Sequence, residues 1–136
     1  MPERNAQQIQ EVVRDYFAAD DRGVAVVYLF GSAARRSDDF RDVDVAILLR
    51  EEPPPGLDGL CLDMGAELEG RLGVPVDLVV LNRAPVDLVH RVLRDGILLL
   101  DRDSSLRIRF EVKARNEYFD LEPVLRRYRM PGREPS

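Results

Sequence analysis

The sequence predicts one α/β domain in which helices cover the faces of a layered sheet. Short, nearly continuous apolar runs, which are typical of buried strands, alternate with longer segments whose apolar residues recur at helical spacing. The chain has 136 residues, 45% of them hydrophobic, which is enough for one ordinary hydrophobic core. The expected order is helix, strand, loop, strand, helix, strand, helix, strand, helix, and this order is typical of α/β folds.

The first elements are one helix and two strands. An apolar stripe at positions i, i+3, i+4, i+7 and i+8 predicts a helix over residues 5–19. Residues 24–30 form an apolar run that predicts a buried strand ending at Gly31, and residues 43–49 predict a second strand. The polar residues 33–41 between them predict a loop or a short helix. The stripe of the first helix consists of Ile9, Val12, Val13, Tyr16 and Phe17.

A strand–helix–strand unit occupies the middle of the chain. Three prolines and a glycine at 53–56 break the chain after the second strand. The spacing of apolar residues then predicts a helix over 57–72, which Gly73 ends, and residues 74–81 predict a third strand. Two strands joined by one helix in this way are expected to be parallel.

The C-terminal third predicts two more helices and one strand. Pro85 suits the first turn of a helix over 85–94, and Gly96 is its expected C-terminal cap. Residues 97–100 predict a short fourth strand. A last helix follows, for which Ser104 or Ser105 is the expected cap, and in which Pro123 must produce a kink or a restart.

A single domain is therefore expected over residues 1–130, and its last helix forms an arm at about 104–130. Residues 131–136 are expected to be a disordered tail. Along the arm, apolar side chains either pack on the domain or bind a partner protein, and both interpretations stay open. These side chains are Tyr118, Leu121, Leu125 and Tyr128.

Composition narrows the function. With Cys61 and His90 as the only cysteine and histidine, a disulfide within the chain and a Cys- or His-based metal cluster are excluded. A metal ion would be held by carboxylates, which favours Mg²⁺ or Mn²⁺. The net charge of −5 argues against a broad nucleic-acid-binding surface. We expect no membrane span, no signal peptide and a cytoplasmic protein, and we interpret His90 as structural.

Three aspartates are the candidate metal ligands. Asp42 and Asp44 point to the same side because side chains alternate along a strand, and Asp77 lies near the start of the next strand of the parallel unit. All three carboxylates can therefore gather at one sheet edge, where divalent cations would relieve their mutual repulsion and bind a nucleoside triphosphate. The alternative is that each aspartate caps a strand end or pairs with an arginine.

Gly31 and Ser32 are the candidate phosphate-binding residues. A glycine directly after a buried strand lets the backbone approach a ligand, and a turn at this point exposes amide groups that suit phosphate oxygens. Gly-Ser after a strand is also common in ordinary turns. If the strands at 24–30 and 43–49 are antiparallel, however, this turn lies at the same edge as the carboxylates.

These motifs resemble those of the polymerase-β-like nucleotidyltransferases, over about residues 24–100. The similarity is closest to the minimal subgroup that includes the MntA antitoxins, and residues 116–121 are similar to their C-terminal region. The family pattern is Gly-Ser, a loop, Asp-x-Asp and a third Asp on a following strand. Here it is matched by Gly31, Ser32, Asp42, Asp44 and Asp77, with Arg35 as the loop arginine.

The resemblance implies a polymerase-β-like fold, a mixed sheet flanked by helices. It implies catalysis at a two-ion Mg²⁺ site of Asp42, Asp44 and Asp77, with Gly31, Ser32 and Arg35 at the nucleotide. The implied reaction transfers AMP from ATP to a tyrosine hydroxyl of a HEPN-family toxin. Such an antitoxin would form a hetero-oligomer with its toxin and would involve neither nucleic acid nor membrane.

The loop departs from the family pattern. Arg36 replaces a common glycine, Arg41 replaces a serine, and the nine residues 33–41 are one fewer than usual. Two other functions therefore stay open. One is an antitoxin that acts by binding alone, and the other is a nucleotidyltransferase for a small molecule such as an aminoglycoside.

Overall fold

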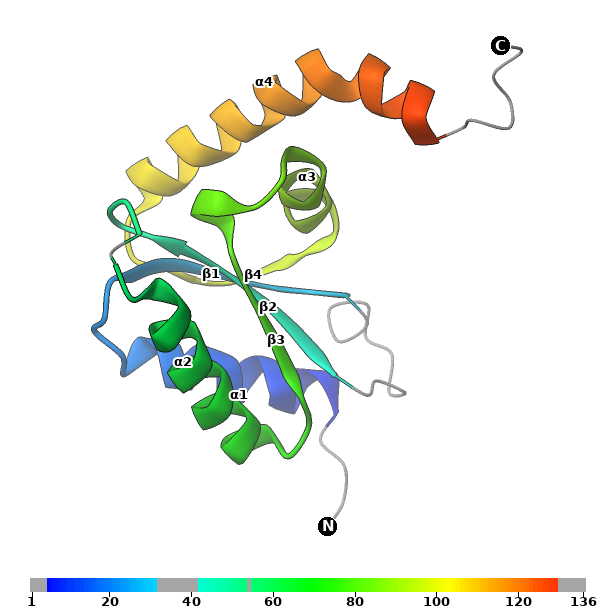
Figure 1. Cartoon of the computed structure of the whole chain (residues 1–136). Helices are drawn as coiled ribbons and strands as arrows, with labels where there is room; N and C mark the ends of the chain where they lie inside the picture. The colour runs from blue at the N-terminus through cyan, green and yellow to red at the C-terminus, as the bar shows by residue number, and fades with distance from the viewer. Residues whose placement is uncertain (1–4, 32–41, 54, 130–136) are drawn as a thin grey trace.

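A mixed β-sheet between two layers of helices forms the described part of the chain (Figure 1). The computed structural model describes residues 5–31, 42–53 and 55–129. Within them the sheet has the strand order β3-β2-β1-β4. Its strands are β1 (Val24–Phe30), β2 (Val43–Leu49), β3 (Val76–Val80) and β4 (Ile97–Asp101). The helices are α1 (Ala6–Ala18), α2 (Leu57–Leu72), α3 (Val86–Asp95) and α4 (Ser104–Arg129).

The pairing of the strands sets the geometry of the sheet edge. β1 is antiparallel to both β2 and β4, whereas β2 and β3 are parallel. The parallel pair confirms the predicted strand–helix–strand unit. The antiparallel pair confirms that the end of β1 and the start of β2 meet at one edge, as the candidate site requires.

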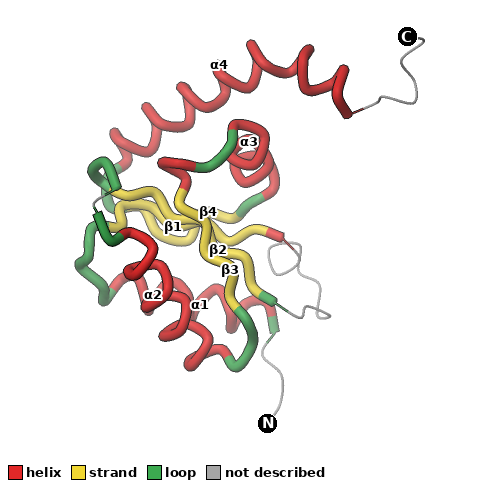
Figure 2. Tube along the Cα trace, in the orientation of Figure 1, coloured by secondary structure: helices red, strands yellow, loops and turns green. Residues whose placement is uncertain are grey.

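The helices divide into two layers, and each layer covers one face of the sheet. Figure 2 shows α1 and α2 on one face and α3 and α4 on the other. Because strand side chains alternate, β1, β2 and β3 each contribute to two separate apolar clusters. Along β2, for example, Val45 and Ile47 pack toward α1 and α2, and Ala46 and Leu48 pack toward α3 and α4.

Helix α1 forms where its apolar stripe and its cap both favour it. Asn5 accepts a hydrogen bond from the amide of Gln8 at 2.8 Å, and the Gln8 side chain accepts one from the amide of Asn5 at 2.9 Å. From there the predicted stripe is buried against the sheet, with Val13 and Phe17 fully inaccessible to solvent. The predicted helix is therefore confirmed, one residue shorter at each end.

Two boundaries differ from the prediction. β3 begins at Val76 rather than at residue 74, because Pro75 has no amide hydrogen to donate and only its carbonyl pairs, with the amide of Val43 at 2.9 Å. The cap of α4 is Asp103 rather than a serine, since its carboxylate accepts the amide hydrogen of Leu106 at 3.0 Å. The hydroxyl of Ser104 donates instead to Asp101.

Helix α4 is one continuous element from Ser104 to Arg129, with Pro123 inside it. Of the two predicted outcomes, a kink or a restart, the continuous helix agrees with the kink, and the ribbon changes direction in its orange C-terminal part (Figure 1). Pro123 is exposed, so the hydrogen bond it removes leaves a carbonyl that water can reach. The expected loop at 33–41 and the expected tail at 131–136 lie outside the described residues.

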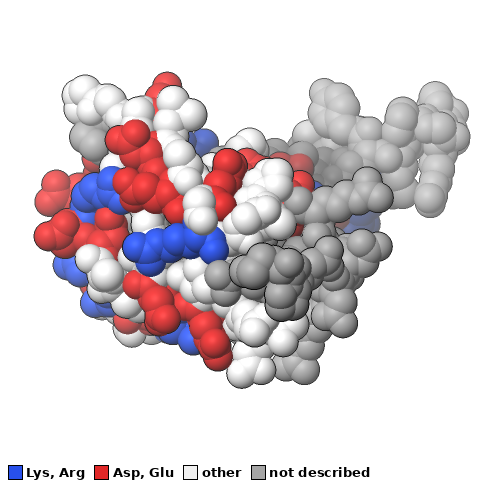
Figure 3. Space-filling view, turned by 90° about the horizontal axis from the view of Figure 1, so that it is seen from below, with Lys and Arg blue, Asp and Glu red and all other residues white. Residues whose placement is uncertain are grey.

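The described surface is polar and of mixed charge. Figure 3, which views the molecule from the side of α1 and α2, shows acidic and basic side chains interspersed. Among the described helices, none combines the length and the apolar character that crossing a membrane requires.

Candidate functional site

Asp44 and Asp77 lie side by side at the edge of the sheet. They are direct partners in the parallel register of β2 and β3. Directly opposed residues of neighbouring strands project to the same face, and here that face is the one covered by α3 and α4. Asp44 is half-buried and Asp77 is exposed. The prediction that the two strands bring these carboxylates together is therefore confirmed.

Asp42 completes the acidic group in electrostatic terms. It is exposed and lies directly before β2, two residues from Asp44. Burial raises the pKa of Asp44, and the negative charges of Asp42 and Asp77 raise that pKa further. The three carboxylates thus act on one another, and ionising Asp44 is unfavourable unless a cation balances the charge.

Gly31 lies against the same carboxylates from the other strand. It directly follows β1, whose last residue Phe30 pairs with Asp44. Its φ of 77° is in the left-handed region, which glycine adopts without strain. A Cβ atom at this position would overlap the Oδ2 atom of Asp44. Glycine is therefore required here both by backbone conformation and by the close approach of an acidic side chain.

A pocket of about 360 Å³ opens between this sheet edge and α3. The sheet contributes Gly31, Asp44 and Asp77, and α3 contributes residues that the sequence analysis missed. Positions 88, 91 and 95 are spaced i, i+3 and i+7, which places them on one helix face. This spacing could have indicated from the sequence that the three residues share a helix face. Only the packing of α3 on the sheet shows that this face lines the pocket. The described lining residues are Phe30, Gly31, Asp44, Asp77, Val79, Leu88, Arg91 and Asp95.

Two predicted nucleotide-binding residues cannot be placed. Ser32 and Arg35 lie outside the described residues, as do Arg36 and Arg41, the two positions at which the loop departs from the family pattern. The described part of the site therefore consists of the acidic edge, Gly31 and the facing side of α3.

The donor chemistry of the acidic edge suits Mg²⁺. Carboxylate oxygens are the ligands this ion prefers, and Mg²⁺ is commonly held by one or two carboxylates together with substrate phosphates. Within the described ranges, no group of three or more His, Cys, Asp or Glu side chains is placed so that it could hold a metal ion. The pair Asp44 and Asp77, with Asp42 beside it, fits an ion that shares its coordination with a nucleotide.

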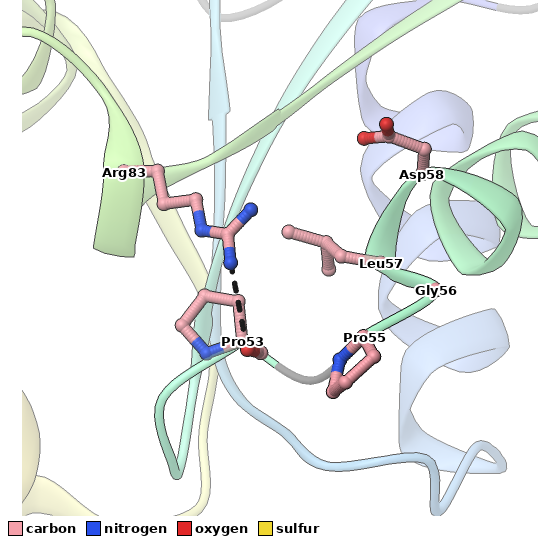
Figure 4. A pocket seen from close by; sticks show the side chains of 6 residues that line it. All are labelled: Pro53, Pro55, Gly56, Leu57, Asp58 and Arg83. Carbon is pink, nitrogen blue, oxygen red and sulfur yellow. Dashed lines mark hydrogen bonds between the residues drawn. The ribbon is translucent and has the colours of Figure 1, made fainter.

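A second pocket, of about 330 Å³, lies where β2 leads into α2 (Figure 4). Arg83 reaches across it and donates to the carbonyl oxygen of Pro53 at 3.5 Å. Asp58 is the acidic residue among its described lining. Its described lining contains no pair of carboxylates like that at the other end of β2.

His90 forms a packing contact between two helices, which agrees with its interpretation as a structural residue. Its ring is half-buried on α3 and stacks on the ring of Tyr118 of α4, with centroids 3.5 Å apart and planes within 4°. This contact joins the two helices of one layer.

Of the predicted arm stripe, Tyr118 and Leu121 are half-buried, and the side chains of Leu125 and Tyr128 lie outside the described set.

The fold and the acidic edge agree with a family match. Residues 7–105 match the family model described as "Polymerase beta, Nucleotidyltransferase". The match covers most of the chain, so the protein belongs to this nucleotidyltransferase family. The mixed sheet flanked by helices is the fold that the resemblance implied. A comparison with curated proteins gave no significant match.

Solved structures of similar fold belong to toxin–antitoxin complexes. One is a tri-AMPylated HEPN toxin of Shewanella oneidensis in complex with its MNT antitoxin, with 22% identity, a TM-score of 0.69, and coverage of 93% of this chain and 96% of the other. A second is the toxin–antitoxin MntA–HepT, with 21% identity, a TM-score of 0.69 and coverage of 93% and 96%. A third is a toxin–antitoxin with AMP-PNP, with 24% identity, a TM-score of 0.68 and coverage of 95% and 97%. At these identities the similarity establishes the fold.

Proposed function

We propose that this protein is an antitoxin that transfers AMP from ATP to a tyrosine hydroxyl of a HEPN-family toxin and thereby neutralises it. The observation that carries the proposal is the direct pairing of Asp44 with Asp77 beside Gly31, which places an acidic, metal-suited edge next to a turn fit for phosphate. Family membership supports the reaction type. The toxin complexes of similar fold, with a tri-AMPylated toxin or AMP-PNP, support the acceptor and the nucleotide.

In this proposal the carboxylates of Asp42, Asp44 and Asp77 hold Mg²⁺ at a two-ion site. Asp42 and Asp44 serve both ions, and Asp77 serves the ion near the acceptor oxygen. When bound, Mg²⁺ supplies positive charge that offsets the phosphate charge and favours an ionised acceptor. The pKa of Asp44 is raised first by burial and then by the same clustered charge.

Gly31 is proposed to hold the triphosphate chain, together with Ser32 and Arg35. The left-handed turn after β1 brings backbone close to the acidic edge with no side chain in between. Backbone amides suit phosphate oxygens because they donate hydrogen bonds at no cost in side-chain entropy. The roles of Ser32 and Arg35 come from the family pattern alone.

The proposed reaction is a single displacement at phosphorus. The acceptor tyrosine oxygen forms a bond to the α-phosphorus of ATP, and the bond from that phosphorus to the pyrophosphate oxygen breaks. The phenolic proton is released, and the products are the adenylylated tyrosine and pyrophosphate. Most of the catalysis in such transfers comes from positioning and from balancing charge, which is what the described side chains are arranged to do.

The partner is proposed to contact the arm formed by α4. One face of α4 packs on the domain through Leu106, Phe110 and Ala114. The other leaves Ile108, Val112 and Phe119 exposed, and Phe119 is 79% accessible. A hetero-oligomer with the toxin would cover such a stripe.

In this proposal residues 1–130 form the single domain with the arm at 104–130. A cytoplasmic location fits the use of ATP.

Label transfer from ATP carrying radioactive α-phosphate tests the proposal. Purified toxin and wild-type protein with Mg²⁺ should yield labelled toxin, whereas D42N and D44N should reduce labelling by at least about 100-fold, because charge balance is lost. D63N, which changes an exposed aspartate of α2, is the matched control and should label normally. Undiminished labelling by D44N would refute the catalytic proposal. Neutralisation of the toxin by D42N and D44N would favour the antitoxin that acts by binding alone.

A further inference from the structure

We propose that Arg91 of α3 contacts a phosphate group of the nucleotide bound at the acidic edge. This inference rests on the proposed function and adds a catalytic residue that the family motif of Gly-Ser and three aspartates does not contain. It rests on the position of Arg91 on the pocket wall opposite Asp44 and Asp77. It also rests on the hydrogen bonds that Arg94 donates to Asp95 on the same helix.

The geometry places Arg91 across the pocket from the carboxylates. Asp44 and Asp77 project from the sheet toward the face that α3 covers. On α3, Leu88, Arg91 and Asp95 line the pocket together, one helical turn apart along a single face. A ligand held at the acidic edge therefore lies between the sheet and this face of α3.

Among the described residues, no salt bridge joins Arg91 to Asp87 or Asp95, the two acidic residues of α3. The carboxylate of Asp95 receives two hydrogen bonds from the guanidinium of the neighbouring Arg94, at 2.9 and 2.8 Å. Arg91 is exposed and forms no hydrogen bond or ion pair with any residue in the described ranges. Its five donors are thus available to a ligand.

The described lining of the pocket contains more acidic than basic side chains. Its described acidic lining residues are Asp44, Asp77 and Asp95, and Arg91 is the basic residue among the described lining. This guanidinium lies beside the space that an anion bound at the acidic edge would occupy.

Phosphate is the anion that fits these features. A guanidinium donates two parallel hydrogen bonds to phosphate oxygens, a geometry that an ammonium group does not reproduce. The pocket volume of about 360 Å³ is of the size of small-ligand sites. Arg91 would approach the phosphate chain from the side opposite Gly31, so that backbone and guanidinium enclose it.

The test measures binding of AMP-PNP with Mg²⁺ by titration calorimetry, and the KM for ATP in the transfer reaction. The variants are R91Q, which removes the charge, and R91K, which keeps the charge but loses the paired donors. R109Q is the matched control, because Arg109 is an exposed arginine of α4 that does not line the pocket. Thermal unfolding without nucleotide checks that each variant is folded.

We expect R91Q to weaken AMP-PNP binding by about 10- to 100-fold, R91K to lie between R91Q and wild type, and R109Q to stay within about twofold of wild type. Wild-type affinity in R91Q would overturn the inference. So would unchanged AMP-PNP binding together with a raised KM for the protein acceptor, because Arg91 would then serve the toxin. Absence of AMP-PNP binding by the wild type would instead overturn the proposed function.

Discussion

Gly31 and Asp44 are in such close contact that no side chain fits between them. A Cβ atom at position 31 would overlap the Oδ2 atom of Asp44, and the φ of 77° at Gly31 belongs to the left-handed region. Gly31, directly after β1, therefore lies in direct contact with Asp44 of β2. The turn proposed to bind phosphate and the carboxylate proposed to bind Mg²⁺ thus lie in direct contact, and only glycine fits at the start of the motif.

The first prediction concerns this contact. G31A should displace the Asp44 carboxylate and reduce AMP transfer by at least about 10-fold, because a positioned charge is lost. G73A is the matched control, since Gly73 has the same φ of 77° and no atom within 4 Å of the added Cβ. Both variants should lose about 1 kcal/mol of unfolding free energy through backbone strain, and G31A should lose more because its Cβ also overlaps Asp44. If G73A reduced transfer as much as G31A, the contact would not be the cause.

The second prediction concerns stability and pH. Because the pKa of Asp44 is raised in the folded protein, ionisation of Asp44 lowers the stability of that state as pH rises above the ordinary value of 3.8. Without metal, D44N should therefore melt about 1–4 °C above wild type at pH 7, and the difference should shrink as pH falls toward that value. Calorimetric scans at several pH values measure it.

Addition of Mg²⁺ and AMP-PNP should raise the melting temperature of wild type and leave that of D44N nearly unchanged. D63N serves as the control for a change of net charge. A melting temperature of D44N below that of wild type at pH 7 would contradict the view that the acidic group is held together against its own repulsion.

The third prediction separates stability from function. Asn82 accepts a hydrogen bond from the buried amide of Leu49 at 2.8 Å and donates one to the Leu49 carbonyl at 3.2 Å. N82A should therefore cost about 1–3 kcal/mol in urea unfolding, since it leaves these groups without partners. N116A, on the exposed surface of α4, should cost almost nothing. AMP-PNP affinity should be unchanged in N82A, and a large loss of affinity would show that the two ends of β2 are coupled.

The fourth prediction concerns the arm. F119S should leave thermal stability within about 0.5 kcal/mol of wild type, because the side chain is 79% exposed. The same change should weaken binding to the toxin by about 10-fold, measured by surface plasmon resonance. L62S, at an exposed leucine of α2 on the other face of the sheet, should bind as wild type does. Equal binding by F119S and wild type would remove α4 from the interface.

The order of elements and the acidic edge were predictable from the sequence because both depend on local patterns. Apolar periodicity located β1, β2 and α1, and the alternation of strand side chains predicted that Asp42 and Asp44 share a face. The parallel direction of β2 and β3 was predicted from the single helix that joins them, whereas the register that sets Asp44 against Asp77 comes from the structure alone.

Long-range packing was not predictable in the same way. That α3 places Arg91 over the acidic edge depends on how the helix lies on the sheet, which spacing alone does not specify. The cap of α4 by Asp103 was missed because Asp and Ser at successive positions compete for one role, and local backbone geometry decides between them. The shorter β3 follows from the missing amide hydrogen of Pro75.

The intact mass of the toxin after co-expression is the most direct test of the central claim. Toxin isolated with the wild-type protein should carry the added mass of one or more AMP groups on a tyrosine, and toxin isolated with D44N should carry none. Unmodified toxin from cells that contain the wild-type protein, in a pair that nevertheless allows growth, would contradict AMP transfer as the means of neutralisation.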